Sequence, residues 1–167
     1  MLVLIPKTVN NKPFNLNLLK ELIQAPKQGE TKTTLHLYFY LEEVKAELGK
    51  ISPENSYWVL MTKDIIPGSR NKTYDCQKEL VHTKGRGSYE LPSAIEAAAS
   101  ILMHYFKTGE CLYIRDPETY TRCQKTVTGE QYPVTIGGFS SYVLDLRCYS
   151  GSNSNEKEDG VAAVRKF

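Results

Sequence analysis

The stretch Ser93–Gly109, SAIEAAASILMHYFKTG, decides the fold because it carries a complete set of helix signals. Ser93 and Glu96 form a capping box, in which the serine hydroxyl accepts from a backbone amide of the first turn and the glutamate accepts from the serine amide. Lys107 lies in the last turn, where a cation suits the helix dipole, and Gly109 follows the end. The sequence therefore predicts a helix over residues 93–108.

One broad arc of this helix is apolar, which predicts that the helix lies in the core. The arc contains Ile95, Ala98, Ala99, Ile101, Leu102, Tyr105 and Phe106. Three successive alanines, 97–99, allow a neighbouring sheet or helix to approach closely. The remaining face carries Glu96, Ser100, His104 and Lys107, which we expect in ordinary solvated positions.

The segments before this helix alternate between helix and strand patterns. A helix is predicted near 15–25, capped by Asn15, and another near 73–82. Residues 33–41 alternate with period two, which predicts a strand. The strand places Leu35, Leu37, Phe39 and Leu41 on one face and His36, Tyr38 and Tyr40 on the other. Residues 56–62 are apolar on both faces, which predicts a central strand, and 42–50 fits either a short helix or a loop.

The carboxy-terminal third changes to strand patterns. Strands are predicted at 111–115, 119–127, 134–139, 142–148 and 161–164, with a polar, mobile loop at 151–160. Helices early and strands late predict an α+β fold, with a mixed or antiparallel sheet packed on the central buried helix at 93–108. The 167 residues show no repeat and no linker, so we expect a single α+β domain over 1–167.

Composition excludes few classes of function. Lys and Arg number 21 and Asp and Glu 19, and this net charge of +2 makes nucleic-acid binding unlikely without excluding it. No stretch approaches the length of a signal peptide's apolar region or of a transmembrane helix, so we expect a cytoplasmic protein with no membrane contact. The cysteines at 76, 111, 123 and 148 lack C-x-x-C spacing and are expected to be free, mostly buried thiols.

No motif points to catalysis, a metal or a cofactor. Cys76 and His82 are six residues apart on one predicted helix, so their side chains point in different directions. The histidines lack ligand spacing. We therefore assign no catalytic residue, no metal ligand and no cofactor, and keep a small hydrolase or transferase, with a site between the core helix and the sheet, as an alternative.

Two glycine-containing basic loops allow a phosphate or anion site. Arg70 and Lys72 precede the helix predicted at 73–82, and Arg86 follows it. A helix amino terminus offers unpaired amides and a dipole that favours negative charge. No phosphate-binding motif accompanies these residues, and solvated loop charges are the favoured interpretation.

Aromatic residues provide the preferred hypothesis, a protein-interaction domain. The candidate partner-binding residues are Trp58, Tyr38, Tyr40, Tyr113, Tyr120 and Arg122. Tyr, Trp and Arg are enriched where proteins bind other proteins. The alternative is that each ring covers the sheet or fills the second layer.

Four strings together resemble a known family: 56–63 (SYWVLMTK), 67–72 (PGSRNK), 107–123 and 160–167 (GVAAVRKF). They are similar to an uncharacterised carboxy-terminal domain that occurs in many paralogous copies in Chlamydia-like bacteria living inside amoebae. The resemblance implies a host-directed bacterial effector, with possible delivery into a host cell, and it supplies no catalytic residues.

Overall fold

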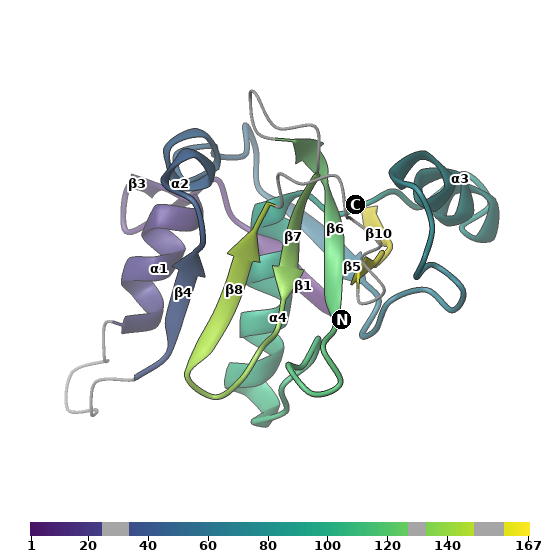
Figure 1. Cartoon of the computed structure of the whole chain (residues 1–167). Coiled ribbons are helices and arrows are strands. Elements are labelled where there is room, and N and C mark those ends of the chain that lie inside the picture. The colour runs from purple at the N-terminus through teal and green to yellow at the C-terminus, as the bar shows by residue number, and fades with distance from the viewer. Residues whose placement is uncertain (25–33, 127–132, 149–158) are drawn as a thin grey trace.

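Helix α4 (Ala94–Thr108) packs against strands of two separate β-sheets and against helix α1 (Leu16–Gln24), as Figure 1 shows. The structure, a computed structural model, describes residues 1–24, 34–126, 133–148 and 159–167. Helices and mixed sheets combine in an α+β fold, which confirms the predicted class.

The larger sheet has five strands in the order β4-β8-β7-β6-β9. These strands are β4 (His36–Phe39), β6 (Tyr120–Thr126), β7 (Pro133–Gly137), β8 (Val143–Arg147) and β9 (Asp159–Gly160). β4 runs parallel to β8 and β9 parallel to β6, while the inner pairs are antiparallel. The sheet is therefore mixed, and its two edge strands come from distant parts of the chain.

The smaller sheet has three antiparallel strands in the order β1-β5-β10, formed by β1 (Leu2–Ile5), β5 (Tyr57–Met61) and β10 (Val164–Lys166). β5 is central, as predicted for 56–62. Val59 and Met61 are buried against the core, whereas Trp58 is half exposed. A short hairpin, β2 (Thr8–Val9) with β3 (Lys12–Pro13), precedes α1.

Local capping explains where the helices begin. The Asn15 side chain accepts from the amide of Leu18 at 2.9 Å at the start of α1. Helix α3 (Tyr74–Lys84) is capped by Thr73, whose side chain accepts from the Cys76 amide. These helices confirm the predictions for 15–25 and 73–82. Residues 42–50, which fit either a short helix or a loop, contain helix α2 (Glu42–Leu48).

Helix α4 has the predicted capping box, but the prediction of a solvated polar face is wrong for Glu96, Ser100 and His104, whereas Lys107 is exposed as predicted. Every residue from Ile95 to Leu102 is buried, and His104 is only 9% exposed. The physical reason is that both sheets pack on the helix, so the face opposite the apolar arc is also covered. His104 bonds Glu110 at 2.8 Å, and Ser100 Oγ has no hydrogen-bond partner among the described residues.

Three predictions in the carboxy-terminal third also differ from the structure. Residues 111–115 form no strand, because Tyr113 has a φ of +53°, outside the range that strands require. The predicted loop at 151–160 ends in strand β9; its remaining residues, 151–158, lie outside the described residues. Residues 161–163, predicted as strand, instead connect β9 in the large sheet to β10 in the small sheet.

Candidate functional site

The outer face of the small sheet exposes apolar side chains. Pairing across the strands sets Leu2 opposite Leu60 and Leu4 opposite Trp58, and Phe167 continues β10 by exchanging backbone hydrogen bonds with Trp58. We call the outward-facing set the apolar sheet face: Leu2, Leu4, Trp58, Leu60, Arg165 and Phe167. Leu2 and Phe167 are each 61% exposed and Trp58 is 48% exposed. Exposed apolar side chains that adjoin one another mark interaction surfaces more often than isolated ones do.

Arg165 supplies the one charge of this face. Its guanidinium lies 4.9 Å from the centre of the Phe167 ring, within the range of a cation–π contact. Arg165 pairs with Leu60 across the strands, so the cation lies beside the apolar rows. Lys166, the next residue, points inward to the core side of the sheet, where it contacts Glu96 at 3.1 Å.

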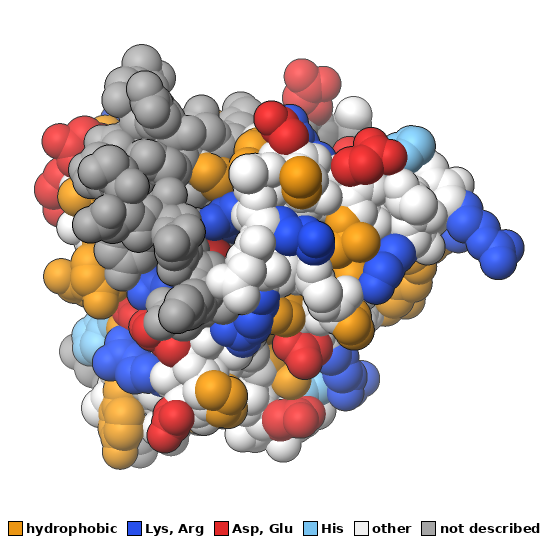
Figure 2. All heavy atoms as spheres, turned by 45° about the vertical axis from the view of Figure 1, so that its right-hand side comes forward, with side chains coloured by type: hydrophobic (Ala, Val, Ile, Leu, Met, Phe, Trp, Pro, Cys, Tyr) orange, Lys and Arg blue, Asp and Glu red, His pale blue; other side chains and the backbone are white. Residues whose placement is uncertain are grey.

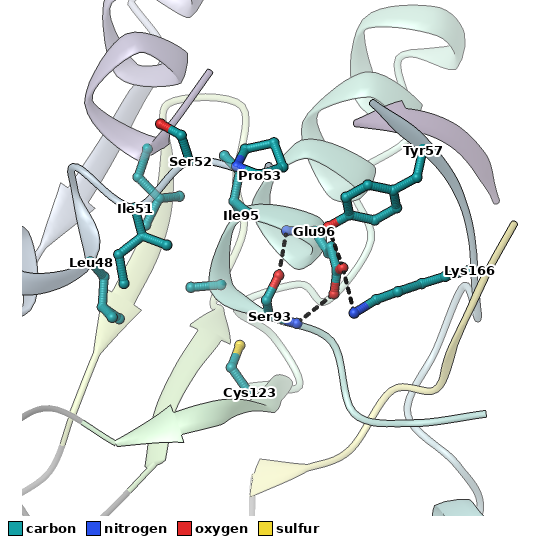
Figure 3. A pocket seen from close by; sticks show the side chains of 12 residues that line it. Leu48, Ile51, Ser52, Pro53, Tyr57, Ser93, Ile95, Glu96, Cys123 and Lys166 are labelled. Carbon is teal, nitrogen blue, oxygen red and sulfur yellow. Dashed lines mark hydrogen bonds and ion pairs between the residues drawn. The ribbon is translucent and has the colours of Figure 1, made fainter. Parts of the chain in front are cut away.

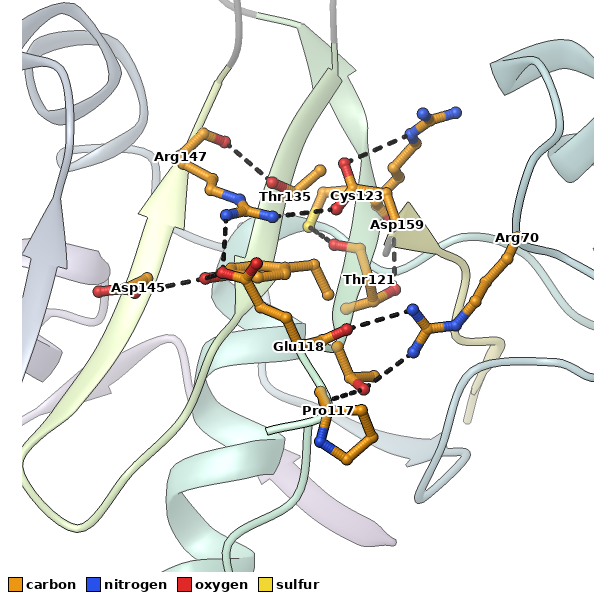
Figure 4. A network of polar contacts seen from close by, with 12 residues as sticks. Arg70, Pro117, Glu118, Thr121, Cys123, Thr135, Asp145, Arg147 and Asp159 are labelled. Carbon is orange, nitrogen blue, oxygen red and sulfur yellow. Dashed lines mark hydrogen bonds and ion pairs between the residues drawn. The ribbon is translucent and has the colours of Figure 1, made fainter. Parts of the chain in front are cut away.

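The outer face of the large sheet has the opposite chemistry: it carries a buried charged network (Figure 4). The network consists of Arg122, Arg147, Asp145 and Asp159 on the strands, with Glu118, Tyr120 and Arg115 beside them. The strand register places these side chains together, since Tyr120 pairs with Asp159 and Arg122 pairs with Thr135, which in turn pairs with Arg147.

Arg147 is the centre of the network. Its guanidinium contacts Glu118 Oε1 at 3.2 Å and Asp159 Oδ1 at 3.4 Å, and it stacks on the Tyr120 ring at 3.2 Å from the ring centre. The Tyr120 hydroxyl donates to Glu118 at 3.0 Å. Burial raises the pKa of Tyr120, which remains a neutral donor. Buried ions of this kind persist because each has an opposite charge beside it.

Arg122 joins the network to helix α3. Its Nη1 donates to the Gln77 side chain and to the Lys72 carbonyl, both at 3.0 Å. Gln77 in turn donates to the backbone carbonyls of Ser69 and Asp159. Arg122 is 6% exposed, so its hydrogen bonds hold the fold together.

The six residues predicted to bind a partner do not form one surface. Tyr113, Tyr120 and Arg122 are buried, and the Tyr113 hydroxyl donates to the Thr62 carbonyl at 3.0 Å. Tyr38 and Tyr40 are half exposed and meet edge to face, with their ring centres 5.0 Å apart, on edge strand β4 of the large sheet. Trp58 lies on the other sheet.

The three residues predicted for an anion site are also separated. Arg70 donates to the Glu118 carbonyl at 3.1 Å and to the Thr119 hydroxyl at 2.9 Å, which binds it to the loop before β6. Lys72 and Arg86 lie at opposite ends of α3, whose length is about 16 Å from its 11 residues at 1.5 Å each. The three cations therefore do not converge on one anion.

Sequence reasoning missed a cavity at the amino end of α4 (Figure 3). Glu96 lies there with no exposed surface, and its carboxylate accepts from the Tyr57 hydroxyl at 2.6 Å and the Ser93 amide at 2.7 Å. Burial and the hydrogen bond to Glu96 raise the pKa of Tyr57. The capping motif indicated only the bond to Ser93; the inward positions of Tyr57 and Lys166 follow from strand pairing, which the sequence does not specify.

Cys123 lines the same cavity but is not set up as a nucleophile. Burial raises the pKa of its thiol, and its Sγ lies 4.0 Å from the Thr121 carbonyl. Histidine is absent from the described residues that line the cavity, and the one cation among them, Lys166, contacts Glu90 and Glu96. A catalytic thiol needs a base or a cation that stabilises its thiolate, so this geometry does not favour cysteine chemistry.

Within the described ranges, no group of His, Cys, Asp and Glu side chains is arranged to hold a metal ion. The helices in those ranges are too short or too polar to cross a membrane. The four cysteines form no disulfide with one another; Cys123 and Cys148 are buried, Cys111 is intermediate and Cys76 is exposed. Comparisons with protein-family models, with curated proteins and with solved structures find no match to this chain.

Proposed function

We propose that this chain is a protein-interaction domain that binds its partner through the apolar sheet face. The observation that carries the proposal is that Leu4, Trp58 and Phe167 are exposed side by side on one face of the small sheet. A tryptophan among aliphatic neighbours is the typical centre of a protein interface, because it buries a large area at low entropic cost. Tyr38 and Tyr40 on the large sheet are not part of this surface.

The charge of the face indicates the chemistry of the partner. Arg165 is its only charged residue, so the complementary surface combines apolar side chains with a carboxylate opposite Arg165. The same six side chains of a second copy would bring another arginine and no acidic side chain. Nucleic acid is disfavoured because one cation neutralises little phosphate, and the side of the molecule seen in Figure 2 intersperses acidic with basic side chains.

The resemblance to the paralogous domain of Chlamydia-like bacteria extends this proposal. A host-directed effector would use the apolar sheet face to bind a protein of the amoebal host. That host protein would need the same complementary surface, apolar side chains with a carboxylate opposite Arg165. The peptide selection described next tests this case as well.

Panning of a phage-displayed peptide library against the whole chain tests the proposal. We expect the selected peptides to combine apolar residues with Asp or Glu. Trp58→Ser should weaken their binding at least tenfold, as expected for an interface centre, and Arg165→Glu should weaken acidic peptides most. Tyr142→Ser, an exposed aromatic residue on the other sheet, is the matched control and should bind as the wild type does.

Three outcomes would overturn the proposal. Selected peptides could bind Trp58→Ser and the wild type equally, or could lack acidic residues. Sedimentation could also show a dimer that Trp58→Ser dissociates, which would make a second copy the occupant of the face.

A further inference from the structure

The cavity at the amino end of α4 is a separate feature from the apolar sheet face. It lies on the core side of β5 and β10, because Tyr57 and Lys166 point inward between the outward-facing residues. Its volume is about 180 Å³. The side chains that line it come from α1, from α2 and the segment after it, from strands β5, β6 and β10, and from α4 with its capping residue Ser93 (Figure 3).

One end of the cavity is apolar. It is lined by Leu16, Leu48, Ile51, Pro53, Ala94 and Ile95. Ile51 is 41% exposed, which places it at the mouth. An apolar cavity of about 150 Å³ accepts a benzene ring, so the whole cavity, at about 180 Å³, has room for a ligand about that size.

The other end is polar and held in place before any ligand arrives. Glu96 is fixed by Tyr57, by the Ser93 amide and by the ammonium of Lys166 at 3.1 Å. Lys166 also contacts Glu90 at 2.7 Å. Burial opposes the charge of Lys166, but these two carboxylates outweigh it and raise the pKa of the ammonium. A fixed polar group at the end of an apolar cavity is the usual design of a small-molecule site.

The hydrogen-bonding capacity that remains selects the ligand's polar group. Lys166 has three N–H donors, and Glu90 and Glu96 are its carboxylate partners among the described residues, which leaves one donor. The Tyr57 oxygen donates to Glu96 and can still accept a bond. One available donor beside one available acceptor matches a hydroxyl.

Charge disfavours a ligand with an ionised group. Glu90, Glu96 and Lys166 sum to a charge of −1, which repels a carboxylate or phosphate. A ligand ammonium would have to lie beside the ammonium of Lys166. We propose that this cavity binds a small, uncharged molecule with an apolar body about the size of one ring and a hydroxyl group directed at Tyr57 and Lys166.

Calorimetric titration of the whole chain with benzyl alcohol, toluene and benzoate tests this site. We expect benzyl alcohol to bind in the millimolar range, toluene about tenfold more weakly for lack of the hydroxyl, and benzoate not at all. Tyr57→Phe should reduce benzyl alcohol binding to the level of toluene and leave toluene unchanged. Tyr142→Phe, which removes an exposed hydroxyl from the large sheet, is the matched control.

Two substitutions from different elements fill the cavity and locate the binding. Ala94→Leu on α4 and Ser52→Leu on the segment before β5 should each abolish benzyl alcohol binding. If one of the two variants does not fold, the other still tests the site. The proposal fails if no probe binds, if benzoate binds as well as benzyl alcohol, or if neither filled variant that folds loses binding.

Discussion

The two sheets carry opposite chemistry on their outer faces. The large sheet buries charge: the Arg147 side chain is 5% exposed and Asp159 is fully buried. The small sheet exposes apolar groups: Trp58 is 48% exposed and Phe167 is 61% exposed. Both faces depart from the ordinary arrangement of a folded protein, in which charges are exposed and large apolar side chains are buried.

This difference indicates that the outer face of the large sheet contributes to stability and that of the small sheet to recognition. A buried ion pair costs desolvation energy and persists when each charge has its partner, so the network on the large sheet depends on completeness. An exposed apolar face contributes little to folding, and its free energy becomes available when another surface covers it. We therefore expect substitutions on the large sheet to change stability and substitutions on the small sheet to change binding.

Arg147→Met should produce the largest effect. The substitution removes the cation that contacts both Glu118 and Asp159 and leaves their carboxylates without it. Breaking one partner of a buried pair costs about 3–5 kcal/mol, a large part of a typical total stability of about 5–15 kcal/mol. Urea unfolding measures the change.

The control for this prediction is Arg165→Met on the apolar sheet face, which should change the free energy of unfolding by less than about 0.5 kcal/mol. If Arg147→Met lowers the free energy of unfolding by less than about 1 kcal/mol, the charged network does not stabilise the large sheet. The proposed difference between the two sheets would then be wrong.

Glu96→Gln should have the next largest effect. Glu96 is a buried charge at the core side of the small sheet, and the substitution removes its ion pair with Lys166 while an amide oxygen can still cap α4. We expect a loss of about 2 kcal/mol in the free energy of unfolding. Glu90→Gln affects the other, partly exposed partner of Lys166 and should cost less than about 1 kcal/mol. Equal losses for the two variants would contradict this account.

Trp58→Ser should have a small effect on stability because the ring is half exposed on an uncovered face. We expect a change of less than about 1 kcal/mol. Val59→Ala, one residue along the same strand but fully buried, should cost about 2–3 kcal/mol. Thermal unfolding of the two variants measures the contrast between the two sides of β5. A Trp58→Ser loss as large as that of Val59→Ala would mean that the face is covered within the chain.

Glu110→Gln should have the smallest effect, and its effect should depend on pH. The hydrogen bond from His104 lowers the pKa of Glu110, so the ionised carboxylate stabilises the folded state above the unfolded pKa of about 4.3. This contribution is lost as pH falls through the lower, folded pKa. The difference in melting temperature between wild type and variant should therefore be present at pH 7 and vanish near pH 3. A difference that does not change with pH would rule out this ionisation as its cause.

Periodicity was a good guide where an element packs on one side. Strand β4 was predicted to put His36, Tyr38 and Tyr40 on one face, and these residues are exposed while Leu35, Leu37 and Phe39 are buried. The same reasoning was wrong for α4, because a polar stripe was taken to mean solvent. In the structure, a second layer covers Glu96, Ser100 and His104, and of that stripe only Lys107 is exposed.

Side-chain exposure was the weakest part of the site prediction. Tyr113, Tyr120 and Trp58 look alike as aromatic residues in strand-like sequence, yet only Trp58 reaches the surface. Tyr113 bonds the Thr62 carbonyl and Tyr120 is covered by Arg147, and both partners are distant in the chain.

The sequence by itself determined the helices, their caps and the α+β class, because these depend on residues within a few positions of one another. Only the tertiary structure decided that α4 contacts two sheets, that Arg122 and Arg147 share Asp159, and that Glu96 meets Tyr57 and Lys166 at a cavity. The contacts of Asp159 and Glu96 join residues between 12 and 70 positions apart, and those of α4 with β1 join residues still further apart. Strand order and register create them, and no local pattern encodes strand order.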